Sequence, residues 1–219
     1  MMMRNNMISS PEPAVVEDGN NPSSPHWNGC SGSSNDTIFK EHPQNSGILH
    51  LSPRALSIIW GNDKRFWQWI SLDEEEKSVF GIGAELLQVN WIEVTGKLEY
   101  SKYNKLHPKM TYEIYYVVKF KVDAFGWHSI PIKFLVKQQI QNEEEKLIVE
   151  TSEILEPYRK SIDVWHCIYG GHFTVPDDSK GFVEFGMFEV DSDWWKGSMV
   201  LQGIKFQPKK KDPNTVLIN

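Results

Sequence analysis

Hydrophobic and polar residues alternate along most of the chain beyond residue 47, and this period of two is typical of β-strands. The clearest segment is 110–123, MTYEIYYVVKFKVD, which is rich in Tyr, Val, Ile and Phe and contains no Gly or Pro. Other extended segments are predicted at residues 56–60, 66–70, 84–100, 130–140, 147–155, 163–175 and 181–208. About eight strands at roughly ten-residue spacing, with no long segment of helical period, predict an all-β fold, an antiparallel β-sandwich or jelly roll.

Three details of this pattern remain open to more than one interpretation. Gly96 interrupts the segment 84–100, where it suggests a β-bulge, and Gly170 and Gly171 interrupt the segment 163–175. Residues 147–155 fit either a strand or a short helix.

The alternation is missing at both ends of the chain. Residues 1–46 are rich in Ser, Asn, Pro and Gly, and such a segment buries too little apolar surface to offset the entropy of ordering it. We therefore predict a disordered tail over residues 1–46, dispensable for ligand binding, a folded domain over 47–208, and a basic C-terminal tail over 209–219.

Residues 56–69, LSIIWGNDKRFWQW, contain three of the nine tryptophans. The turn-forming residues Asn62 and Asp63 follow Trp60, and Trp67 and Trp69 come next, two positions apart on one face of a strand. A polar turn between aromatic side chains suits a flat, hydroxyl-rich ligand, because rings stack on its C–H patches and polar groups orient its hydroxyls. The alternative is that these tryptophans belong to the core, where large aromatic side chains usually lie.

The overall charge narrows the classes of ligand. There are 29 acidic and 23 basic residues, a formal net charge of −6, which argues against a protein that binds the phosphate backbone of nucleic acids. No segment has the length and apolar character of a signal peptide or a membrane span, so we expect a cytoplasmic protein. In that compartment the glycosylation sequon at Asn35 would be unused.

The two cysteines exclude a disulfide framework and a Cys-rich zinc site. His166 and Cys167 would point to opposite faces of one strand, so we expect no metal and no cofactor. Cys30 lies near Trp27 in the predicted tail and is a candidate crosslinking residue, although neither residue need have a specific role. We expect Cys30 to react before Cys167, which lies in an apolar strand.

Glu189, Asp191 and Asp193 follow one another at every second position. Carboxylates in such a series could accept hydrogen bonds from sugar hydroxyls, or two of them could act as the acid and base of a glycosidase. Asp191 and Asp193 could equally be turn residues before Trp194. Spacing alone does not decide among these interpretations, and no nucleophile motif or phosphate-binding glycine loop favours an enzyme.

Four blocks of sequence, in order, carry a family resemblance. Residues 56–69 fit the pattern L-x-I-x-W … D/N-P-x-Y-W-x-W, except that Lys64 replaces the proline and Phe66 the tyrosine. The other blocks are Trp91–Leu98, Thr111–Phe120 and Gly181–Pro208. In these blocks the chain resembles the phloem lectin family, also called phloem protein two or Nictaba-like lectins.

The resemblance implies a jelly-roll β-sandwich that binds N-acetylglucosamine oligomers (chito-oligosaccharides) and N-glycan cores without catalysis. It places the sugar site at Trp60, Trp67 and Glu189, while a second acidic position of the family falls on Phe182. Lesser candidates for the same site are Asn62, Asp63, Trp69 and Trp195.

The resemblance also implies partners and a location. They are glycoproteins, a second copy of the chain in a homodimer, and phloem filament proteins, in phloem sieve-element sap, with a role in defence or transport. The alternative is a structural or interaction protein, crosslinked to filament proteins or carrying RNA, and the acidic net charge disfavours RNA.

Overall fold

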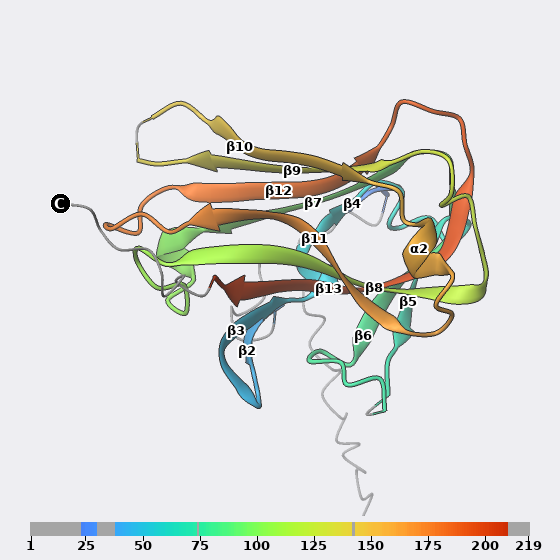
Figure 1. The fold of residues 1–219 in the computed structure, drawn as a ribbon, viewed down its shortest axis with the longest axis horizontal. Coiled ribbons are helices and arrows are strands. Elements are labelled where there is room, and N and C mark those ends of the chain that lie inside the picture. The colour runs from blue at the N-terminus through green and yellow to red at the C-terminus, as the bar shows by residue number, and fades with distance from the viewer. Residues whose placement is uncertain (1–22, 30–37, 74, 142, 210–219) are drawn as a thin grey trace, which may run out of the picture.

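The computed structural model describes residues 23–29, 38–73, 75–141 and 143–209. In these residues two sheets of antiparallel strands pack face to face, which confirms the predicted β-sandwich (Figure 1). One sheet has the strand order β1-β4-β7-β12-β9-β10. The other has the order β11-β8-β13-β3-β2, and β6 joins it at β13 and carries β5 as its outer neighbour.

The strands are β1 (Trp27–Asn28), β2 (Phe39–His42), β3 (Asn45–Leu51), β4 (Ser57–Ile58), β5 (Trp67–Ser71), β6 (Ile82–Val89), β7 (Ile92–Glu99), β8 (Thr111–Phe125), β9 (Ile132–Gln139), β10 (Lys146–Glu153), β11 (Trp165–Thr174), β12 (Phe182–Glu189) and β13 (Lys196–Pro208). Short helical segments lie at η1 (Pro53–Ala55), η2 (Tyr100–Lys102) and α2 (Glu156–Arg159). Residues 147–155 therefore form mostly strand, followed by the single turn of α2.

The core lies between the two sheets and follows from the alternation. Along β7 every second residue is buried, from Ile92 to Leu98, while Glu93, Thr95 and Lys97 reach the outer face. Aromatic rings fill the space between the sheets; Phe185 of β12, for example, packs edge-on against Phe206 of β13 at 5.6 Å between ring centroids. This alternation fixes which side chains can meet a ligand on the outer faces.

The segment 84–100 is not one strand with a bulge. It is two strands, β6 and β7, and they belong to different sheets, so the chain crosses the sandwich at Asn90 and Trp91. Gly96 lies inside β7, and an added Cβ there would come within 2.5 Å of the Phe185 ring. The glycine makes room for a core ring, and the bulge prediction at this position is wrong.

The predicted tail is also wrong for part of its length. Trp27 is only 6% exposed, and β1, to which it belongs, pairs with β4. Its indole Nε1 donates a hydrogen bond to the Arg54 carbonyl at 3.0 Å, and its ring packs against Trp69 at 4.8 Å. Residues 39–42 form β2, which pairs with β3. The folded body thus includes residues that local composition assigned to a tail, because their few apolar side chains reach the core.

The glycine pair in β11 behaves as predicted. The register between β11 and β8 shifts between Tyr169 and Gly171, and Gly171 has a φ of +124°. That backbone conformation is unfavourable for residues with a Cβ, so the glycine is required at this break.

Candidate functional site

The stretch 56–69, expected to form the ligand surface, divides between core and surface. Trp67 lies in β5 with its side chain only 3% exposed, as a member of the central core. Trp69 is partly buried against Trp27. The prediction that Trp67 contacts the ligand is therefore wrong, and the alternative assignment of these residues to the core is correct.

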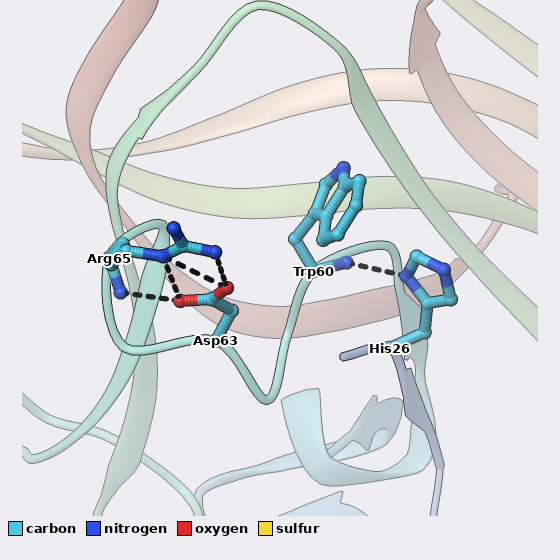
Figure 2. Close-up of polar contacts among 4 residues, drawn as sticks. All are labelled: His26, Trp60, Asp63 and Arg65. Carbon is cyan, nitrogen blue, oxygen red and sulfur yellow. Dashed lines mark hydrogen bonds and ion pairs between the residues drawn. The ribbon is translucent and has the colours of Figure 1, made fainter. Parts of the chain in front are cut away.

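Trp60, like Trp69, is partly buried and packs against the core, but it lies in the turn before β5 rather than on a strand (Figure 2). Its φ of 63° is in the left-handed region, which is uncommon for a bulky residue. The Trp60 amide donates to Nδ1 of His26 at 3.0 Å, and the Trp60 carbonyl accepts from the Asp63 amide at 2.9 Å. Strained backbone held by its surroundings often marks a functional position, so Trp60 stays a candidate.

Asn62 holds the N-terminal segment in place. Its side-chain Nδ2 donates to the carbonyls of Ser24 and His26 at 3.0 and 3.1 Å. Because His26 in turn accepts a hydrogen bond from the Trp60 amide, Asn62 supports the conformation of Trp60.

Asp63 organises the turn before β5 (Figure 2). Its carboxylate accepts hydrogen bonds from the Arg65 amide at 3.0 Å and from Nη2 of the Arg65 guanidinium at 2.6 Å. These bonds from Arg65 lower the pKa of Asp63 to about 2. The carboxylate is thus ionised and already engaged by its own turn.

Glu189 is 3% exposed and forms an ion pair with Lys196, which is 1% exposed. A carboxylate buried in this way does not face a ligand, so the expected surface of Trp60, Trp67 and Glu189 is not formed. Lys196 Nζ also donates to the carbonyls of Asn90 at 3.0 Å and Trp194 at 2.8 Å. Glu189 therefore neutralises the lysine that ties the β6–β7 turn to the β12–β13 loop.

These two tied loops carry the exposed tryptophans of the molecule. Trp91 of the turn is 47% exposed, and Trp194 and Trp195 of the loop are 45% and 47% exposed. The loop that carries Trp60 adjoins them, because the Ile59 amide donates to the Glu93 carbonyl at 3.1 Å. We call the region made of these two loops and the neighbouring turn, with Trp60, Trp91, Trp194 and Trp195, the tryptophan end.

The structure therefore brings two of the predicted residues, Trp60 and Trp195, to one end of the sandwich. Trp91 and Trp194 were not predicted as site residues. Their signal in the sequence is weak but present: each lies beside a polar turn residue, Asn90 or Asp193, where the alternation that buries a strand tryptophan ends.

The tryptophan end can bind through stacking and hydrogen bonding. The rings of His128 and Trp194 pack in a T-shaped arrangement, with 5.6 Å between ring centroids and an interplanar angle of 79°. Asp193, next to Trp194 in the β12–β13 loop, is exposed, whereas Asp191 forms an ion pair with Lys133 at 2.5 Å. With Glu189 buried, the three acidic residues do not form the facing pair that a glycosidase uses. Within the described ranges, no cluster of His, Cys, Asp and Glu is arranged to hold a metal ion.

Several sequence predictions fall elsewhere. Cys30 and the sequon at Asn35 lie outside the described residues. Cys167 of β11 is a free and exposed cysteine, so the expectation that its strand shields it is wrong. No helix in the part of the chain that the structure describes is long and apolar enough to cross a membrane.

Comparison with known proteins agrees with the sequence resemblance. The family model described as phloem protein 2 matches residues 47–208. An F-box protein of Arabidopsis thaliana is 29% identical over 80% of this chain, Phloem protein 2-like A1 of the same plant is 27% identical over 76%, and a protein named lectin from Luffa acutangula is 30% identical over 75%. The matched region spans 55%, 64% and 72% of these three relatives, respectively.

Among solved structures, the CBM22-1–CBM22-2 tandem domain of Paenibacillus barcinonensis Xyn10C aligns with 61% of this chain and 36% of its own, with a TM-score of 0.34 and 14% identity. That likeness is too distant to inform the ligand. The family model, in contrast, covers the sandwich from within β3 to the end of β13. The chain belongs to the phloem protein 2 family.

Proposed function

We propose that this protein is a non-catalytic lectin that binds oligomers of N-acetylglucosamine, including those of N-glycan cores, at the tryptophan end. The observation that carries the proposal is the exposure of Trp91, Trp194 and Trp195, each about half open, on two loops joined by Lys196. Exposed aromatic rings held by a buried ion pair form a preorganised stacking surface.

The family supports the ligand class. A relative from Luffa acutangula is named lectin, and it shares 30% identity with this chain. The family resemblance adds the preference for N-acetylglucosamine and a location in phloem sap. A homodimer would raise the avidity for glycoproteins without any new contact at the single site.

The site as proposed differs from the one that the resemblance implied. Trp60 and Trp195 act as ligand contacts, together with Trp91 and Trp194. Trp67 and Glu189 act as structural residues: Trp67 is part of the core, and Glu189 neutralises Lys196. Asn62 and Asp63 fix the backbone on either side of Trp60's turn.

The test is calorimetry with chitotriose on the parent protein and on Trp195→Ala and Trp91→Ala. Stacking on one ring contributes about 0.5–1.5 kcal/mol, so each variant should bind up to about ten-fold more weakly. Tyr169→Ala is the matched control, since Tyr169 is a partly exposed aromatic residue within β11 of the seven-stranded sheet and does not belong to the tryptophan end. Circular dichroism checks that each variant is folded.

Two results would overturn the proposal. If folded Trp195→Ala and Trp91→Ala bind chitotriose as the parent does, the sugar site lies elsewhere. If the parent binds no chito-oligomer, the protein is not a lectin of this class and an interaction protein takes its place.

A further inference from the structure

The segment 23–28 packs against the turn that carries Trp60, although it lies outside the part of the chain that the family model matches. That match begins at residue 47. Trp27 of this segment is buried, and an added Cβ at Gly61 would lie only 2.6 Å from the Trp27 Cβ. Gly61 therefore allows the two segments to approach closely. The turn of the tryptophan end is thus built against residues outside the shared domain.

Asn62 joins the turn to three consecutive residues of this segment. Its backbone amide donates to the Pro25 carbonyl at 3.1 Å, and its side-chain Nδ2 donates to the carbonyls of Ser24 and His26 at 3.0 and 3.1 Å. The His26 amide in turn donates to Ser24 Oγ at 3.2 Å. These bonds fix the position of His26 relative to the turn.

The His26 imidazole contacts Trp60 in two ways (Figure 2). Its Nδ1 accepts a hydrogen bond from the Trp60 amide at 3.0 Å, and its ring packs edge-on against the Trp60 ring, with 5.0 Å between centroids and an interplanar angle of 62°. The φ of 63° at Trp60 is a conformation that a bulky residue keeps only when its surroundings hold it. The two contacts from His26 supply part of that restraint.

The bond from the Trp60 amide requires that Nδ1 of His26 carry no proton. A backbone N–H is always a donor, whereas both ring nitrogens of a protonated imidazole are donors as well. Protonation at Nδ1 would therefore set two N–H groups against each other and break the contact. His26 is partly exposed, so protons can reach it. Histidine side chains change charge between about pH 5 and 8, so the contact is sensitive to pH in that range.

The surroundings of His26 give a proton no ionic partner. In the described part of the chain its hydrogen-bond and ring partners are uncharged side chains and backbone groups, those of Ser24, Trp60 and Asn62. The charged residues of the same turn, Asp63 and Arg65, are bonded to each other. Glu93 of β7 meets the turn through its backbone carbonyl, and the Arg54 guanidinium lies over the Trp69 ring. Protonation of His26 thus loses one bond and gains no ion pair among these groups.

We propose that neutral His26 is a positioning residue for Trp60, and that protonation of His26 weakens ligand binding at the tryptophan end. The inference rests on the proposed lectin function, in which Trp60 is a ligand contact. It adds that residues 23–28 are needed for full affinity, contrary to the prediction that the segment before residue 47 is dispensable. Binding is then tight where the imidazole is neutral and weakens as the pH falls.

Calorimetry with chitotriose between about pH 8 and pH 5 tests the proposal. The affinity of the parent should fall with the pH, up to about ten-fold, which is the contribution of one stacked ring. His26→Asn should bind as the parent does at the upper pH and keep that affinity at the lower one, because the Asn Oδ1 can accept the Trp60 amide and does not titrate. His26→Leu, which has no acceptor, should show the low affinity at both.

Two other histidines provide controls. His172→Asn changes an imidazole of β11, in the seven-stranded sheet, and should keep the pH dependence of the parent. His128→Asn changes the imidazole that packs against Trp194. If the pH dependence disappears in His128→Asn and persists in His26→Asn, the group responsible lies beside Trp194 and the proposal is wrong. Burial lowers the pKa of His50 to about 4, so His50 stays neutral throughout the experiment.

An NMR titration tests the contact without any sugar. The Trp60 amide resonance should shift with the same midpoint as the His26 imidazole, and it should not shift in His26→Asn. Different midpoints would overturn the positioning role even in a protein that binds chitotriose, and so would a parent affinity that does not change with pH. Equal midpoints in a protein that binds no chito-oligomer would confirm the pH-dependent contact and overturn the lectin function alone.

Discussion

Trp27 and Trp67 are buried and Trp69 packs on Trp27, whereas Trp91, Trp194 and Trp195 are about half exposed. The first three lie on strands, on the faces that point inward. The other three lie where the chain leaves one sheet for the other. The same residue type therefore stabilises one region and is exposed in another, where we propose that it binds the ligand, and its place relative to the end of a strand decides which.

The strongest test of this division is Trp67→Ala. Removing a buried tryptophan leaves a cavity and should lower the free energy of unfolding by about 3–5 kcal/mol. Urea denaturation followed by circular dichroism measures the loss. The matched change Trp195→Ala should alter the free energy of unfolding by less than about 0.5 kcal/mol, because its side chain is about half exposed and lies outside the core.

Trp67→Phe sharpens the result, since it keeps much of the buried volume. It should stay folded and bind chitotriose as the parent does. Lost binding in a well-folded Trp67→Phe would mean that this tryptophan contacts the ligand after all.

The sequence predicted the strands well and the site poorly, and the tryptophans show why. Alternation is a local property, so the β8 and β11 segments could be identified from their own residues. Alternation places Trp67 and Trp69 on one face of β5 and Gln68 on the other, but whether the tryptophan face meets the core or a ligand depends on which part of the fold covers it. The crossing at Asn90 and Trp91 depends on Lys196, which is 106 residues away from Asn90.

Glu189 shows the same limit for a charged residue. A carboxylate in the last strand-like block suggests a ligand contact, and only the fold reveals that the partner is Lys196 of the next strand. Likewise, Trp27 looked like an isolated aromatic residue in a polar segment. Its pairing through β1 with β4 is a contact between segments about 30 residues apart.

The second test acts on the support of the tryptophan end. Lys196→Met removes the ammonium group and leaves the Glu189 carboxylate buried without its partner, which should cost about 3 kcal/mol of stability. It also releases the carbonyls of Asn90 and Trp194, so chitotriose should bind more weakly in the folded fraction. Thermal unfolding and calorimetry measure the two effects.

The double variant Glu189→Gln, Lys196→Met separates charge burial from loop positioning. It should regain part of the lost stability, because no uncompensated charge remains. Its affinity should stay low, since neither side chain replaces the three bonds of the lysine. Full recovery of affinity would show that the loops hold their positions without Lys196.

The smallest effect is expected at Arg54, which lies beside the buried tryptophans. Its guanidinium carbon is 5.0 Å from the Trp69 ring centroid and 5.5 Å from that of Trp27. Arg54→Met keeps the length of the side chain and removes the charge, so it should cost about 0.5–1 kcal/mol of stability. The hydrogen bond from Trp27 Nε1 should survive, because its acceptor is the backbone carbonyl of residue 54.

Measuring the sugar binding of this variant tests whether Trp27 and Trp69 are structural residues or ligand contacts. Urea denaturation should show the small loss of stability for Arg54→Met and a smaller one for Arg54→Lys, which retains a cation near the rings. Calorimetry with chitotriose should give the parent affinity for both. A drop in affinity of ten-fold in either folded variant would place Trp27 and Trp69 in the ligand site, and the division between structural and ligand-binding tryptophans would then no longer hold.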